Sequence, residues 1–93
     1  MPSLNAGDLA GCLLHKLRAT EVGGAHRRFR IYDDRGTLVA QTSMSRGWRH
    51  STTLTSGMVR DIASQLGLPL STQLVELVRC TLTRDDYLGI ASP

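Results

Sequence analysis

The histidine and arginines of segment 23–34 are the residues whose types and spacing are best suited to chemistry. His26 follows two glycines and precedes Arg27, Arg28 and Arg30. An imidazole exchanges protons near neutral pH, and guanidinium groups match the oxygens of a phosphate. This combination suits metal-independent RNA cleavage. A proton is taken from the ribose 2′-hydroxyl or given to the leaving 5′-oxygen, while cations offset the developing phosphorane charge.

Signature motifs of other chemistries do not occur in the chain. It contains no phosphate-binding loop, dinucleotide-binding glycine motif, zinc-protease helix or serine-hydrolase elbow. Its three histidines and two cysteines lack the close spacing of metal ligands, so we predict no metal site and no cofactor. Cys12 and Cys80 lie within apolar helical patterns and are predicted to be buried thiols of a reducing compartment.

Positive charge is concentrated in the middle of the chain. The formal net charge is +3 over 93 residues. The segment from His26 to His50 contains six arginines and two aspartates, so its formal charge is about +4. The formal charge of the rest of the chain is therefore about −1. A basic centre flanked by near-neutral ends favours a nucleic acid or an acidic protein as partner.

The basic centre supplies the candidate RNA-binding residues. We predict that RNA phosphates are contacted by Arg28, Arg30, Arg46 and Arg49. Trp48, between the last two, could stack on a base or could cover the edge of the core. His50 lies in the same basic segment and is the candidate for a second proton-transfer group beside His26.

The alternation of residues 26–33 predicts a strand that positions these groups. Phe29 and Ile31 would face the core. The opposite face would hold His26, Arg28, Arg30 and Tyr32.

A hairpin that pairs residues 26–33 with 36–42 is predicted from the turn signal of residues 33–36, Asp-Asp-Arg-Gly, and from the run over 37–42, which is rich in β-branched residues. Residues 19–22 are a weaker strand candidate, which would complete a three-stranded antiparallel meander. Residues 43–54 show no clean period, and we predict a polar, mobile connection there.

Helical patterns lie on both sides of the predicted sheet. The first covers residues 5–18, with Asn5 as its cap and leucines 9, 13 and 17 on one face. A second begins near Thr55 or Ser56 and ends at Leu66 before Gly67 and Pro69. Ser71 is predicted to cap a third helix, and Thr83 with Asp86 a fourth.

The predicted fold class is therefore α+β, in the order α-β-β-β-α, with the helices on one face of a three-stranded antiparallel sheet. We expect a single domain over residues 1–93, with a core over 5–68 and a C-terminal helical extension over 71–93. The sequence has no apolar run of membrane-spanning length and no secretory signal, so a cytoplasmic protein without membrane contact is expected.

Two stretches resemble the HicA-type toxins, a family of small RNA-cleaving proteins. Residues 24–29, Gly-Ala-His-Arg-Arg-Phe, resemble that family's Gly-Ser-His-x-x-Phe motif, with alanine in place of the serine. Residues 54–68 resemble its closing helix, and the likeness covers about residues 5–68. The resemblance implies a double-stranded-RNA-binding-like fold, His26 as the catalytic residue of an mRNA-cleaving endoribonuclease, and a HicB-type antitoxin as partner.

Two alternatives to catalysis remain open on the sequence. The same domain could be a non-catalytic RNA-binding module, or it could be a protein-interaction domain whose arginines meet an acidic partner.

Overall fold

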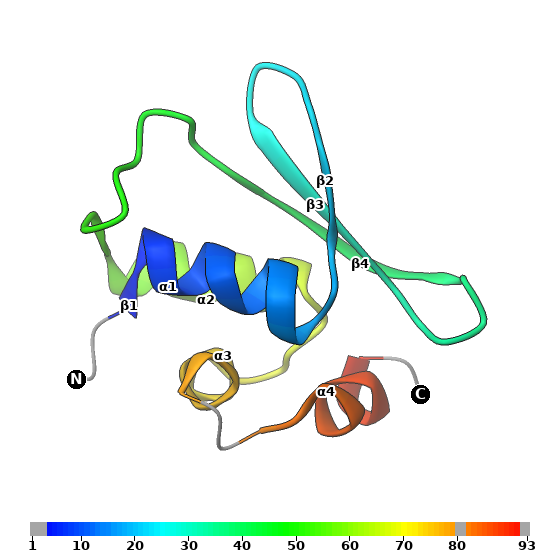
Figure 1. The fold of residues 1–93 in the computed structure, drawn as a ribbon. Helices are drawn as coiled ribbons and strands as arrows, with labels where there is room; N and C mark the ends of the chain where they lie inside the picture. The colour runs from blue at the N-terminus through cyan, green and yellow to red at the C-terminus, as the bar shows by residue number, and fades with distance from the viewer. Residues whose placement is uncertain (1–3, 80–81, 92–93) are drawn as a thin grey trace.

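The computed structural model describes residues 4–79 and 82–91 and shows an α+β domain (Figure 1). In chain order, its elements are β1 (Leu4–Asn5), α1 (Ala6–Gly11), the π-helix η1 (Cys12–Lys16), β2 (Thr20–Val22), β3 (Arg27–Tyr32), β4 (Leu38–Met44), β5 (Thr53–Leu54), α2 (Ser56–Gln65), α3 (Ser71–Val78) and α4 (Arg84–Ala91). Strands β2, β3 and β4 form an antiparallel sheet in that order, and β1 pairs with β5 in a second small sheet. The α+β class and the three-stranded meander are confirmed.

Strand β3 is the centre of the larger sheet and is built on the predicted alternation. Phe29 and Ile31 are fully buried, and β3 contacts η1. Each such side chain stabilises the fold by about 1.5–3 kcal/mol. Thr42 and Met44 of β4 face the same core, where the Thr42 hydroxyl donates to Gln65 Oε1 of α2 at 2.6 Å.

The turn between β3 and β4 has the predicted chemistry. The Asp33 carboxylate accepts hydrogen bonds from the amides of Arg35 and Thr37, each at 2.9 Å. Gly36 has φ +80°, a conformation that glycine adopts without a steric penalty. Local side-chain bonding and one glycine therefore set this end of the hairpin.

The first helix forms where predicted, with a wider final turn. Asn5 caps α1, since its side-chain oxygen accepts from the Asp8 amide at 2.7 Å. Leu17 N donates to Cys12 O at 3.0 Å, five residues back, as in a π-helix. Arg18, at φ 56°, then ends the helix. Leu9, Leu13 and Leu17 are fully buried, as their spacing predicts.

The prediction of an irregular connection over residues 43–54 was wrong at both ends. Ser43 and Met44 extend β4, and Thr53 and Leu54 form β5 opposite β1. A strand of two residues is too short to show an alternating pattern in the sequence, and its partner strand lies about fifty residues away along the chain.

The predicted start of α2 is confirmed, whereas its end at Gln65 and the start of α3 at Ser71 each differ from the prediction by one residue. Thr55 caps α2 by accepting from the Met58 amide at 3.2 Å, and Gly67 follows its end at φ +80°. Ser71 is the first residue of α3 rather than its cap. Leu70 occupies the cap position, and its amide donates to Gln73 Oε1 at 3.0 Å. The glutamine makes the return contact of a capping box, and the side-chain cap that was expected from serine does not form.

The C-terminal helices belong to the core of the domain. Leu74 and Leu77 of α3 and Tyr87 of α4 are fully buried. Thr83 and Asp86 form the predicted capping box, with reciprocal hydrogen bonds of 3.0 and 3.1 Å. Arg84 reaches the β3–β4 turn, where it donates to Asp34 Oδ1 at 2.8 Å and Tyr32 O at 3.2 Å. Cys12 is buried as predicted, and Cys80 lies outside the described residues.

We predict that Tyr87→Phe destabilises the domain in a pH-dependent way. The Tyr87 hydroxyl donates to Leu66 O at 2.8 Å, so its loss at neutral pH should cost about 1–3 kcal/mol. Burial raises the pKa of Tyr87 from 10.0 to about 12. The stability that depends on the protonated hydroxyl is therefore present below pH 10 and is lost as the pH rises towards 12.

Urea unfolding of both proteins, at neutral pH and between pH 10 and 12, measures this gap. We expect the gap to close as the pH rises. A gap that stays constant over this range would contradict the buried hydrogen bond.

Candidate functional site

Strand β3 distributes its arginines between the two faces of the sheet. Arg28 and Arg30 lie on the face opposite Phe29 and Ile31, as predicted. Register places Thr20 and Gln41 beside Arg30, and Val22 and Ser43 beside Arg28. Arg30 Nε donates to Gln41 Oε1 at 3.1 Å. None of these neighbours carries a carboxylate, so both guanidinium groups keep their positive charge uncompensated on this face.

His26 does not lie on this face as a strand residue, which corrects the prediction. Strand β3 begins at Arg27, and His26 lies exposed in the preceding loop. Gly24 takes φ +144° there, and Arg46 Nε donates to the Gly24 carbonyl at 2.8 Å. This tertiary contact brings Arg46, a predicted RNA-binding residue, to the loop that carries His26, although the two residues are twenty positions apart in the sequence.

Arg27 lies on the core side of the sheet, where it pairs with Glu21. Its Nε and Nη2 groups each donate to the Glu21 carboxylate at 3.0 Å, and its guanidinium lies 5.2 Å from the centre of the Phe29 ring. The hydrogen bond to Arg27 lowers the pKa of Glu21, with Arg46 adding a weaker attraction. The same hydrogen bond raises the pKa of Arg27. Both groups are therefore charged, and the arginine has one preferred orientation.

Segment 45–52 folds back over α1 and is fixed by backbone hydrogen bonds. The Gly7 amide donates to His50 O at 2.9 Å, and the Ala6 amide donates to Thr52 O at 2.8 Å. Within the segment, Arg49 N donates to Thr52 Oγ1 at 2.8 Å and Gly47 N donates to Ser45 Oγ at 3.1 Å. These bonds preform the wall that this segment adds to the domain.

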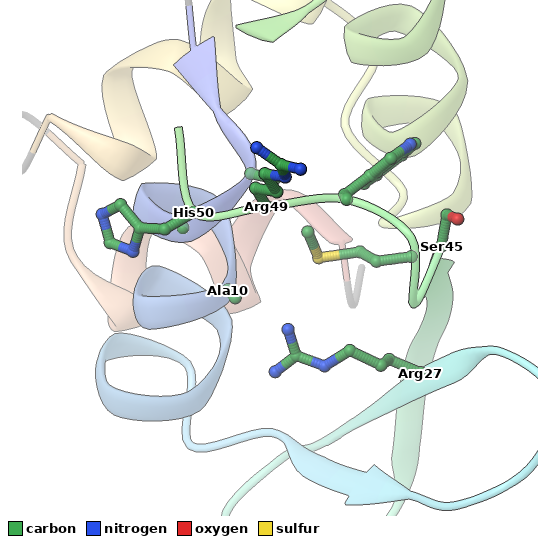
Figure 2. A pocket seen from close by; sticks show the side chains of 9 residues that line it. Ala10, Arg27, Ser45, Arg49 and His50 are labelled. Carbon is green, nitrogen blue, oxygen red and sulfur yellow. The ribbon is translucent and has the colours of Figure 1, made fainter. Parts of the chain in front are cut away.

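A cleft of about 250 Å³ lies between this segment, α1 and the sheet (Figure 2). Its uncharged lining consists of Ala6, Gly7, Ala10, Met44, Ser45 and Trp48. Its basic lining consists of Arg27, Arg49 and His50. Figure 2 shows Arg27 reaching from β3 towards α1, beneath the segment that carries Ser45 and Arg49. The cleft thus combines a small-residue floor, one large aromatic side chain and a cationic rim.

His50 rests against the backbone of α1. A Cβ added at Gly7 would lie only 2.0 Å from His50 Nδ1, so the absence of a side chain at Gly7 makes room for the imidazole. His50 Nε2 lies 4.0 Å from Asp8 Oδ1, and both side chains are largely exposed. An exposed pair at this distance contributes little to stability. The ring position is therefore set mainly by its fit against glycine.

The predicted site residues fall into three places. Arg28 and Arg30 lie on the sheet face opposite Phe29 and Ile31, Arg46 donates to the loop that carries His26, and Trp48, Arg49 and His50 line the cleft. His50 thus belongs to the cleft lining, and His26 does not. Arg27 and Ser45 were missed as cleft residues. The alternation that buries Phe29 also places Arg27 on the core side, and that signal could have identified it.

Within residues 4–79 and 82–91, no three His, Cys, Asp or Glu side chains are grouped so that they could hold a metal ion. In the same part of the chain, every helix is too short or too polar to cross a bilayer. Comparisons with protein-family models, curated proteins and solved structures find no match to this chain.

We predict that Gly7 and His50 are energetically coupled. Replacing glycine by alanine in a helix gains about 0.5–1 kcal/mol of stability, but in the wild-type protein the added methyl must displace the His50 ring. In a His50→Ala background the ring is absent, so Gly7→Ala should give the full gain. Urea unfolding of the four proteins of this double-mutant cycle measures the difference. Equal effects of Gly7→Ala in both backgrounds would contradict the placement of His50.

Proposed function

We propose that the protein binds RNA through Arg28 and Arg30 of β3 together with Arg46 beside the His26 loop. The observation that carries the proposal is the charge pattern of the sheet face opposite Phe29 and Ile31, where the strand neighbours of two arginines are polar or apolar and carry no carboxylate. Arginine forks match phosphate oxygens, and a face of this kind favours a polyanion. Phosphate contacts of this kind position the RNA backbone and carry no sequence information directly.

We further propose that the domain is of HicA type, with a double-stranded-RNA-binding-like fold. The order α1, β2, β3, β4, α2 supports this proposal, as does the glycine-rich loop that places a histidine immediately before an arginine-bearing strand. In this proposal the RNA is messenger RNA in the cytoplasm, and the natural inhibitor is a HicB-type antitoxin.

In the proposed reaction, the ribose 2′-oxygen attacks the adjacent phosphorus and the bond to the 5′-oxygen breaks. The products are a 2′,3′-cyclic phosphate and a new 5′-hydroxyl end. His26 takes the 2′-hydroxyl proton or gives a proton to the 5′-oxygen, and water exchanges the other proton. Arg46, held at the Gly24 carbonyl, keeps its two terminal amino groups for the phosphorane oxygens. Every atom of the substrate is accounted for without a cofactor.

A non-catalytic RNA-binding module is the second candidate. One observation favours it: His50, the expected second proton-transfer group, lies in the cleft, which His26 does not line. A single exposed histidine in a loop is a weaker acid–base device than a pair.

The binding proposal predicts a salt dependence that two arginines control. The logarithm of RNA affinity should fall linearly with the logarithm of salt concentration, and each lost phosphate contact should reduce the slope by about 0.7 on a single strand. We expect Arg28→Gln and Arg30→Gln each to show this reduction in fluorescence anisotropy titrations. Arg60→Gln, at an exposed position of α2, is the matched control and should leave the slope unchanged. Salt-insensitive binding, or equal effects of all three variants, would contradict the proposal.

The catalytic proposal predicts that His26→Ala abolishes RNA cleavage and leaves the fold intact, because His26 is exposed. Purified proteins are incubated with RNA in EDTA, and the new ends are examined for cyclic phosphate. Induced expression tests growth arrest in parallel. His15→Ala is the matched control, because this exposed histidine of η1 belongs neither to the His26 loop nor to the cleft lining and should be dispensable. If wild type binds RNA and does not cut it, the non-catalytic module is the correct function.

A further inference from the structure

The cleft beneath segment 45–52 has a composition that the sheet face lacks. It places the chain's single tryptophan next to small apolar residues and a cationic rim, whereas the aromatic side chain that shares the sheet face with Arg28 and Arg30 is Tyr32, at the end of β3. We infer that this cleft binds one unpaired nucleotide of RNA, with its base against Trp48 and its phosphate on Arg49 and Arg27. This inference rests on the proposed RNA binding. It adds a site for one base of the RNA to the phosphate contacts of the sheet face.

The size of the cleft suits a nucleotide rather than a larger ligand. Its volume is about 250 Å³, and pockets for drug-sized ligands span about 300–1,000 Å³. Ala6 and Ala10 line one wall with small side chains, and the His50 ring occupies the space over Gly7 beside them. Trp48 and Met44 supply the large apolar surfaces, and Trp48 is half-buried, with part of its surface accessible. Base stacking on an exposed aromatic side chain is sequence-tolerant, because every base has a π-face.

The cationic rim is organised for a phosphate. Arg27 is held by Glu21 through Nε and Nη2, which leaves its Nη1 group for a ligand. Arg49 is exposed, and its side chain makes no hydrogen bond or ion pair with the described residues. Ser45 also lines the cleft, and its hydroxyl oxygen accepts from Gly47 N. No lining residue is acidic, and two carboxylates contact the rim from outside the lining: Glu21 binds Arg27, and Asp8 lies 4.0 Å from His50 Nε2.

The walls are already in place without a ligand. Hydrogen bonds from Ala6 and Gly7 fix the far end of segment 45–52, and bonds within the segment fix Ser45 and Arg49. Binding then requires little ordering of the chain, which lowers its entropic cost. An acidic peptide could satisfy the two arginines, but it would leave the exposed part of Trp48 without a planar partner. The aromatic wall therefore favours a nucleotide.

Trp48 provides a direct signal, because it is the chain's only tryptophan. The full chain is titrated with adenosine 5′-monophosphate, ribose 5-phosphate, inorganic phosphate and a glutamate-rich peptide, and tryptophan fluorescence is recorded. We expect the nucleotide to quench Trp48, and the three ligands without a base to bind at least roughly tenfold more weakly. Arg49→Gln should weaken the nucleotide roughly tenfold, whereas Arg60→Gln should have no effect. Equal binding of ribose 5-phosphate or of the peptide would overturn the inference.

A second titration uses a short fluorescein-labelled single-stranded RNA and is read by anisotropy. Trp48→Ala should weaken binding roughly tenfold, and Trp48→Phe should restore most of the loss because phenylalanine retains a stacking ring. If the labelled RNA binds with the expected salt slope while Trp48 fluorescence and the Trp48 variants are unaffected, the cleft inference fails and the proposed function stands. If the nucleotide quenches Trp48 while RNA fails to bind at low salt, the proposed function fails and the cleft remains a nucleotide site.

Discussion

Burial of one face of β3 is the constraint on which the rest of the structure depends. Phe29 and Ile31 are fully buried, and Leu13 and Leu17 join them in the same core. Because strand side chains alternate, fixing these two residues also fixes where every arginine of the strand points. A shift of one residue in register would bury Arg28 and Arg30 and expose the core. The direction of the positive charge is thus a consequence of apolar packing rather than of any ligand.

The same constraint gives the two faces of the sheet different electrostatic roles. On the core side, Arg27 is paired with Glu21 through Nε and Nη2. On the opposite face, the strand neighbours of Arg28 and Arg30 carry no carboxylate. A charge near the core needs a partner because desolvation penalises it, whereas an exposed charge does not. The free charge is therefore placed where a polyanion could approach it.

Helix α4 and segment 45–52 are attached to the rest of the domain by hydrogen bonds between distant parts of the chain. Tyr87 and Arg84 connect α4 to the end of α2 and to the β3–β4 turn, so α4 is part of the packed domain. Backbone bonds from Ala6 and Gly7 hold segment 45–52 over α1 and form the cleft. A backbone-anchored wall is less sensitive to side-chain substitution than one held by side chains. Substitution of the rim side chains should therefore leave the shape of the cleft unchanged.

The sequence by itself determined the local features whose physics acts over a few residues. These include the caps at Asn5 and Thr55, the Asp33–Gly36 turn, the Thr83–Asp86 box, and the alternation that buries Phe29 and Ile31. The tertiary structure alone decided the β1–β5 pair, the meeting of Arg46 with the His26 loop, and the cleft that unites Arg27 with Arg49. Each of these joins segments some twenty or more residues apart and leaves no periodic signal in the chain. For the same reason the sequence placed His26 on a strand that in fact starts one residue later, because pairing partners decide where a strand begins.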